Sequence, residues 1–158
     1  MLLVNIPEER KPILIGKDGA TKASIEKKTK TKIKISVEIQ IEGENELVAG
    51  EIVKAIGRGF SPHRALRLLG SDCLLDVIQI KGTQKKIKRL MSRVIGTHGK
   101  TRSNIEESTR ASVSVYGRTI SIIGNYKQVD NAKEAIEMLL QGSKHTTVYR
   151  YLASLGLE

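Results

Sequence analysis

Two short glycine motifs are the residues of this chain whose type and spacing could do chemistry. The sequence GKDG occupies positions 16–19, and GTHG occupies positions 96–99, 80 residues later. Glycine allows close backbone approach and left-handed φ angles. Backbone N–H groups at the start of a following helix can then face an anionic oxygen. The pattern predicts two places where a phosphate group lies against the main chain.

The residues around both motifs recur at the same offset. The matching residues are Ile15, Thr21, Ile25, Glu26 and Thr29 in the first copy and Ile95, Thr101, Ile105, Glu106 and Thr109 in the second. One such glycine pair would mean little in a chain with 14 glycines. A pair repeated with its flanks indicates a duplicated structural unit. We interpret the four matching isoleucines as core residues.

Hydrophobic periodicity predicts the elements that must position these motifs. In the first copy we expect a strand at 2–6, a short helix from Pro7, a largely exposed helix at 20–28, strands at 32–37 and 38–41, and a helix at 46–56. In the second copy we expect a strand at 75–81, helices at 83–93 and 100–108, strands at 113–115 and 120–122, and a helix at 129–140. The predicted fold is α+β, with the order β-α-α-β-β-α twice.

Two further helices are expected outside the repeats. Ser61-Pro62 is a good N-cap followed by proline at the first helical position, which predicts a linking helix at 63–69. The apolar residues of the tail after Gly142 predict a final helix. We expect two domains, at 1–72 and 73–158, that share an interface sealed by the linking helix and the tail.

The charge of the chain favours an anionic partner. The formal net charge is +10 in 158 residues, and lysines and arginines cluster around both glycine motifs. A strongly basic balance of this kind indicates partners such as nucleic acids and says nothing of the fold.

Enzyme and cofactor functions find little support in the sequence. The GKT at 99–101 lacks the glycine that a nucleotide-phosphate loop needs at position 94, where Val94 stands. The histidines have no carboxylate or cysteine partners at metal-binding or relay spacings, and Cys73 is the only cysteine. We therefore expect no enzyme activity, metal or cofactor. The short apolar start and the lack of a long apolar run predict a cytoplasmic protein.

The element order and the motifs together resemble the type I KH domain. The resemblance is carried by residues 14–35 and by their copy at 94–115. The runs at 16–22 and 29–33, with the flanking segments at 53–60 and 142–152, resemble the Dim-two or Partner-of-Nob-One family of small-subunit ribosome assembly factors in its short archaeal form. The resemblance implies two tandem type I KH domains that bind single-stranded RNA near the 3′ end of small-subunit ribosomal RNA. It also leaves open an adaptor role, in which one KH domain contacts the alpha subunit of translation initiation factor two or the Nob-One endonuclease.

A KH loop clamps about four nucleotides of single strand. The resemblance places the opposing wall of each groove at residues 32–37 and 112–115, with an exposed strand edge facing the bases. The implied RNA-binding residues are Gly16, Lys17, Asp18, Gly19, Lys22, Lys32 and Lys34 in the first copy and Gly96, Thr97, His98, Gly99, Lys100, Arg102 and Arg110 in the second.

The chain departs from the KH pattern at two positions of each copy. Lys22 and Arg102 stand where an aliphatic residue is usual, and Lys30 and Arg110 stand where glycine is usual. These substitutions predict stronger attraction to the RNA backbone and poorer discrimination between bases.

Overall fold

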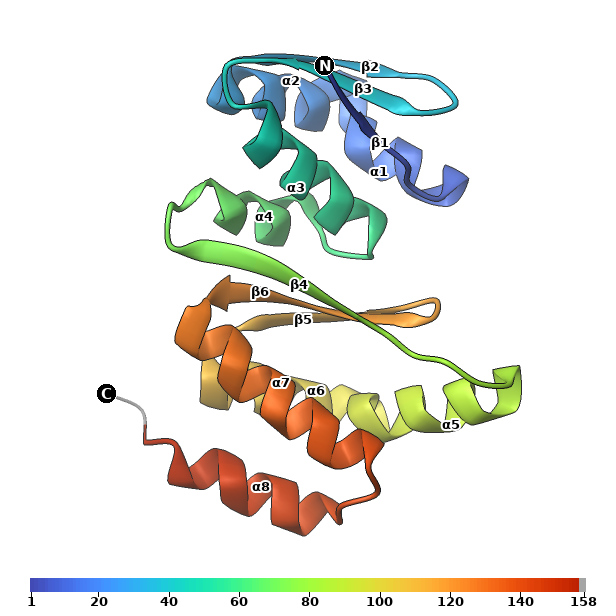
Figure 1. Cartoon of the computed structure of the whole chain (residues 1–158), viewed down its shortest axis with the longest axis vertical. Helices are drawn as coiled ribbons and strands as arrows, with labels where there is room; N and C mark the ends of the chain where they lie inside the picture. The colour runs from blue at the N-terminus through green and yellow to red at the C-terminus, as the bar shows by residue number, and fades with distance from the viewer. Residues whose placement is uncertain (157–158) are drawn as a thin grey trace. The chain divides into compact units, whose positions relative to one another are not determined.

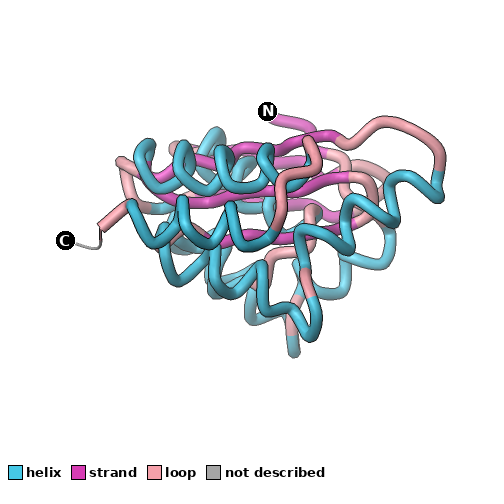
Figure 2. The backbone as a smooth tube through the Cα atoms, turned by 90° about the horizontal axis from the view of Figure 1, so that it is seen from below, coloured by secondary structure: helices cyan, strands magenta, loops and turns pink. Residues whose placement is uncertain are grey.

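The computed structural model describes residues 1–156 and divides into two compact units, Met1–Leu75 and Asp76–Glu158. Each unit contains one three-stranded sheet with helices packed on it, in the predicted order (Figure 1). Short loops join the elements, and most of the described chain is helix or strand (Figure 2).

The first unit follows the predicted element order closely. Its elements are β1 (Leu2–Val4), the 3-10 turn η1 (Glu8–Arg10), α1 (Lys11–Ile15), the 3-10 turn η2 (Lys17–Gly19), α2 (Ala20–Thr29), β2 (Thr31–Ile35), β3 (Ile39–Gly43) and α3 (Glu46–Gly57). Pro12 lies in the first turn of α1, where its missing N–H leaves no helical hydrogen bond unmade. The helix before the glycine motif is short, as predicted, but Pro12 lies at its start and does not interrupt it.

The first sheet has the strand order β1-β3-β2, with both pairs antiparallel. Ile33 pairs with Ile41, and both are buried, whereas Lys32 and Lys34 alternate with Ile33 and are exposed. This period of two is the one that a sheet covered on one face requires. Because β2 lies at the edge of the sheet, one side of its backbone faces α2 and not another strand.

The linking helix is α4 (Pro62–Ala65), which continues as the 3-10 turn η3 (Leu66–Leu69). The Ser61 hydroxyl oxygen accepts a hydrogen bond from the backbone N–H of Arg64 at 3.3 Å, so the predicted N-cap is present. Both short helices pack on α3 of the first unit.

The second unit repeats the arrangement and adds a helix. Its elements are β4 (Cys73–Gln79), α5 (Gln84–Ile95), the 3-10 turn η4 (Thr97–Gly99), α6 (Lys100–Thr109), β5 (Ser112–Tyr116), β6 (Thr119–Asn125), α7 (Tyr126–Leu140) and α8 (His145–Ser154). The sheet order is β4-β6-β5, so β5 takes the edge position that β2 has in the first unit. The predicted tail helix is α8, and it packs on α6 and α7 (Figure 1).

The cores of both units are aliphatic, and one prediction about them was wrong. Ile25 and Ile105 are buried as expected. Ile15 is 38% exposed, and Ile95 is only half-buried. In each copy the preceding residue takes the core position, because Leu14 and Val94 are fully buried. The isoleucine before each glycine motif therefore remains available on the surface beside the loop.

Candidate nucleic-acid interface

The two glycine loops have the same backbone shape. Gly16, Asp18 and Gly19 have φ angles of +75°, +55° and +74°, and the matching residues of the second loop have +76°, +56° and +74°. Three residues with positive φ within four positions form a sharp turn, and both loops have it. Asp18 holds such an angle without being glycine, which aspartate tolerates better than most residues.

The two glycines of each loop are needed for different reasons. A Cβ atom added to Gly16 would lie 2.2 Å from the Thr21 hydroxyl oxygen and 2.8 Å from its backbone nitrogen. A Cβ atom added to Gly19 would meet nothing within 4 Å. The first glycine therefore permits close packing of the loop on the next helix, while the second faces open space. The second loop repeats both observations.

Some of the backbone N–H groups at the predicted phosphate sites already donate hydrogen bonds within the protein. The backbone N–H of Gly19 donates to the carbonyl of Gly16 at 3.2 Å, and that of Ala20 donates to the carbonyl of Lys17. The same two bonds occur in the second loop. These amides are therefore already used within the protein and are not among the donors that could face a phosphate. The amides at the two exposed middle positions of each loop remain as the donors closest to solvent.

Neither helix that follows a loop is capped by a side chain. No side-chain hydrogen bond caps the first turn of α2 or of α6. By contrast, Thr83 caps α5, and Asn125 forms a reciprocal capping box with Gln128 in α7. The partial positive charge at the start of α2 and α6 is thus left for solvent or for an external anion.

The first groove is a cavity of about 400 Å³ between α2 and the edge strand β2. Its walls include Lys22 on the helix and Lys32 and Lys34 on the strand, which the sequence predicted as RNA-binding residues. Lys22 Nζ lies 3.4 Å from both carboxylate oxygens of Glu26. Glu26 also lines the cavity, so the positive charge of Lys22 is partly neutralised there.

The edge strand is not open to bases along its whole length, contrary to the prediction. The backbone N–H of Ile33 donates to the Glu26 carboxylate at 2.8 Å, and that of Val113 donates to the Glu106 carboxylate at 2.9 Å. In the second unit an Arg102 guanidinium N–H also donates to the carbonyl of Val113, at 3.4 Å. Side chains of α2 and α6 therefore take the place of a fourth strand. In the sequence, both glutamates stand out only as repeated residues.

The second groove lies elsewhere in its unit, because none of the residues that match Lys22, Lys32 and Lys34 lines it. A cavity of about 500 Å³ lies between α5 and the β5–β6 hairpin, with Met91, Ile95 and Val115 among its apolar lining. Lys88 and Arg118 supply positive charge along it. The strand positions that match Lys32 and Lys34 are Ser112 and Ser114, and each is only 8% exposed. The basic strand wall is therefore a feature of the first unit.

The predicted residues of the loops and the helix starts that follow them are exposed. They are Lys17, Asp18, Thr97, His98 and Lys100. Lys30 and Arg110 end α2 and α6 with φ angles of +55° and +66°. The left-handed angle that glycine normally supplies is thus kept by two charged residues.

Metal clusters and membrane-spanning helices were also sought among the described residues. Within residues 1–156, no group of three or more histidine, cysteine, aspartate or glutamate side chains could hold a metal ion. None of the helices in this range is long and apolar enough to cross a membrane.

Comparisons with known proteins agree with this geometry. A family model described as the eukaryotic type KH domain, type I, matches residues 73–156, and a KH-domain model matches residues 2–57. The crystal structure of Dim2p from Pyrococcus horikoshii OT3 is 47% identical, with a TM-score of 0.90 over 97% of this chain and 98% of that one. The chain belongs to the KH-domain family of Dim2p and PNO1.

Other proteins of this family are also similar to the chain. It is 42% identical to the KH domain-containing protein MJ0443 of Methanocaldococcus jannaschii, over 95% of this chain and 71% of that protein. It is 32% identical to the pre-rRNA-processing protein PNO1 of Candida albicans, but spans only 40% of that protein. A structure of an a/eIF2alpha–aDim2p–rRNA complex from Pyrococcus horikoshii OT3 contains a chain 48% identical to this one, with a TM-score of 0.90 over 97% of this chain and 92% of that one.

Proposed function

We propose that this chain binds single-stranded RNA at the 3′ region of small-subunit ribosomal RNA during assembly of the small ribosomal subunit in the cytoplasm. Both KH domains contribute, each through its glycine loop and the adjoining groove. The protein acts by binding and positioning RNA, without a cofactor and without catalysis of its own.

One observation carries the proposal: two loops of different sequence have the same left-handed backbone, and each precedes a helix that no side chain caps. Lys17 in one loop and Lys100 after the other add mobile positive charge at these points. Main-chain donors and cations together suit a sugar-phosphate chain, because the contact needs no particular base. The similar chain in a complex with ribosomal RNA supports the choice of RNA as the ligand.

The two grooves differ in how they would hold the bases. The first presents lysines from β2, and the second presents an apolar floor around Ile95. We infer that the first unit contributes attraction to the backbone and the second contributes packing against bases. Two weak sites on one chain act at high effective concentration, which lets them bind one strand usefully together.

An adaptor function is the second candidate. The related complex contains a/eIF2alpha together with the Dim2p chain and ribosomal RNA, which favours a protein partner in addition to RNA. In this second function one KH domain contacts the alpha subunit of translation initiation factor two or the Nob-One endonuclease. The two functions are separable, because loop substitutions that abolish RNA binding would leave an RNA-independent partner bound.

Substitution of the loop side chains tests the proposal. Lys17→Asp and His98→Asp change residues in the two loops, and Lys54→Asp on α3 is a control with the same charge change as the first. Binding to a fluorescent single-stranded RNA with the small-subunit 3′-terminal sequence is measured by anisotropy over a range of salt. Each loop variant should weaken binding, and the slope of log affinity against log salt should fall by about 0.7 for each phosphate that the protein no longer neutralises.

The combined loop variant should retain no measurable binding, while the control should bind like the unmodified protein. Equal affinities for all the variants would show that the loops are not the RNA site. Retention of a purified partner protein by the combined loop variant would support the adaptor function.

A further inference from the structure

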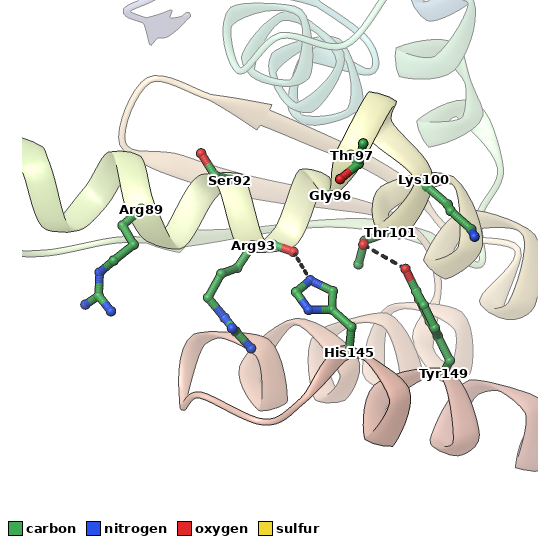
Figure 3. A pocket seen from close by; sticks show the side chains of 9 residues that line it. All are labelled: Arg89, Ser92, Arg93, Gly96, Thr97, Lys100, Thr101, His145 and Tyr149. Carbon is green, nitrogen blue, oxygen red and sulfur yellow. Dashed lines mark hydrogen bonds between the residues drawn. The ribbon is translucent and has the colours of Figure 1, made fainter.

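A basic cleft, separate from the two grooves described above, adjoins the glycine loop of the second unit. It has a volume of about 610 Å³ and lies between α5 with η4 on one side and the added helix α8 on the other (Figure 3). Arg89, Arg93 and Lys100 line it, together with His145 and Tyr149 of α8. None of the described residues that line this α5–α8 cleft is acidic. Its electrostatic character is therefore that of an anion-binding site.

Hydrogen bonds between the two walls fix the shape of the cleft. Tyr149 Oη lies 2.9 Å from the Thr101 hydroxyl, and His145 Nε2 lies 3.0 Å from the Arg93 carbonyl, as Figure 3 shows. A carbonyl only accepts, so His145 carries a proton on Nε2. The Arg93 guanidinium donates to the carbonyl of Leu139 at 3.0 Å and to that of Ser143. The cleft is thus preorganised by contacts that do not use its remaining cations.

Two cationic side chains in the cleft have no partner among the described residues. The side chains of Arg89 and Lys100 reach solvent, and no described residue forms an ion pair or hydrogen bond with either of them. Arg93 uses its N–H groups on carbonyls, which leaves its positive charge without an acid to neutralise it. The half-buried ring of Tyr149 forms part of the wall and can stack against a planar group. A phosphate beside an aromatic base matches both features.

The position of the cleft connects it to the loop. Gly96 and Thr97 of the glycine loop form part of its wall, so a strand held by the loop lies next to its entrance. Arg89 precedes Gly96 by seven residues of helix, roughly 10 Å along the axis. A cation at that distance is placed to contact a phosphate further along the strand than those at the loop itself.

We propose that the α5–α8 cleft binds the phosphodiester backbone of single-stranded RNA just beyond the nucleotides held by the second glycine loop, with one base against Tyr149. This inference rests on the proposed function and extends it to a site that the KH fold alone does not contain, because α8 forms one wall. The planar guanidinium of Arg89 is suited to a phosphate, which it can contact through two N–H groups.

The test uses RNA length in the full chain. Lys17→Asp is introduced first, so that the second unit dominates binding. Oligonucleotides of one sequence are then lengthened one residue at a time, and their affinities are measured by anisotropy for Arg89→Ala and for a control, Lys86→Ala. Lys86 is exposed on the same helix and lines neither cleft of the second unit.

The chain with only Lys17→Asp and the Lys86→Ala control should both gain affinity in a step when the RNA becomes long enough to enter the cleft. Arg89→Ala should lose that step, should bind the shorter RNAs unchanged, and should show a salt slope smaller by about 0.7 on the longer RNAs. The same length dependence in Arg89→Ala as in the control would overturn the inference while leaving the proposed function intact.

Two further outcomes are informative. If none of the RNAs binds the unmodified chain, the proposed function fails as well. If Arg89→Ala weakens an acidic protein partner and leaves the RNA step unchanged, the cleft is a protein site and the inference is wrong. Tyr149→Phe keeps the ring and removes only the hydroxyl that meets Thr101, so it should lower thermal stability without removing the step.

Discussion

Replacement of Glu26 by glutamine, and of Glu106 in the second unit, separates the structural role of these residues from their charge. Each carboxylate accepts a hydrogen bond from the amide of an edge strand, at 2.8 Å and 2.9 Å. A glutamine oxygen can accept the same bond, so Glu26→Gln should fold normally. Alanine cannot, and Glu26→Ala should cost about 1–3 kcal/mol because the Ile33 amide then has no acceptor.

The effect on RNA binding follows from Coulomb's law. A carboxylate roughly 6 Å from a phosphate, in a dielectric close to that of water, is repelled by about 0.7 kcal/mol. Glu26 lies in the first groove and is partly exposed, so the solvent-like value applies. Its neutralisation also releases Lys22, whose ammonium now lies 3.4 Å away. Glu26→Gln should therefore tighten RNA binding about threefold.

The measurement is anisotropy with one single-stranded RNA, alongside thermal unfolding of each variant. A loss of 1 kcal/mol lowers Tm by about 2–4 °C in a chain of this size, so Glu26→Ala and Glu26→Gln should be clearly distinguished. An affinity for Glu26→Gln that is equal to or below that of the unmodified protein, with Tm unchanged, would refute the reasoning. It would mean that the carboxylate does not oppose the phosphates, or that the strand does not follow this groove.

Three other changes have defined outcomes. Lys30→Gly relieves a left-handed backbone angle and should raise stability by about 0.5–1 kcal/mol in chemical unfolding, while weakening RNA binding in the anisotropy assay. Gly16→Ala brings a Cβ atom against Thr21 and should lower the free energy of unfolding by about 2–5 kcal/mol. Gly19→Ala meets open space and should lower it by about 1–2 kcal/mol, because only the backbone angle is strained. Equal losses in chemical unfolding would contradict the packing argument. Burial raises the pKa of the Cys73 thiol. The rate of its alkylation by iodoacetamide should therefore rise with pH around a midpoint above that of a free cysteine. A lower midpoint would contradict the burial of this thiol.

Most of the elements could be predicted from the sequence because their signals are local. Period-two alternation in β2, the Ser61-Pro62 start of α4 and the glycine turns each depend on a few neighbouring residues. The left-handed angles at Lys30 and Arg110 could also have been predicted, since the KH pattern usually has glycine at both positions. The repeat strengthened these predictions, because each pattern within the two copies appears twice.

The contacts that shape the grooves could not be predicted in the same way. In the sequence, Glu26 is one of several charged residues on an exposed helix face, where it could equally pair with Lys22 or Lys30 a turn away. Only the left-handed turn after α2 sends β2 back along the helix and brings the Ile33 amide to the carboxylate. A similar limit applied to Ile15, since an isoleucine beside a glycine turn has no periodic signal to show whether it faces core or solvent.

The two copies keep the loop but distribute their charge differently around it. In the first unit Lys32 and Lys34 stand on the strand, opposite the helix side of the groove. In the second unit the matching serines are buried, so lysines could not occupy those positions without losing their hydration. The cations that line the α5–α8 cleft of that unit lie instead on α5 and at the start of α6, where α8 adds a second wall. The duplication has therefore kept the backbone geometry of the loop, while the cations of each copy lie on a different side of it.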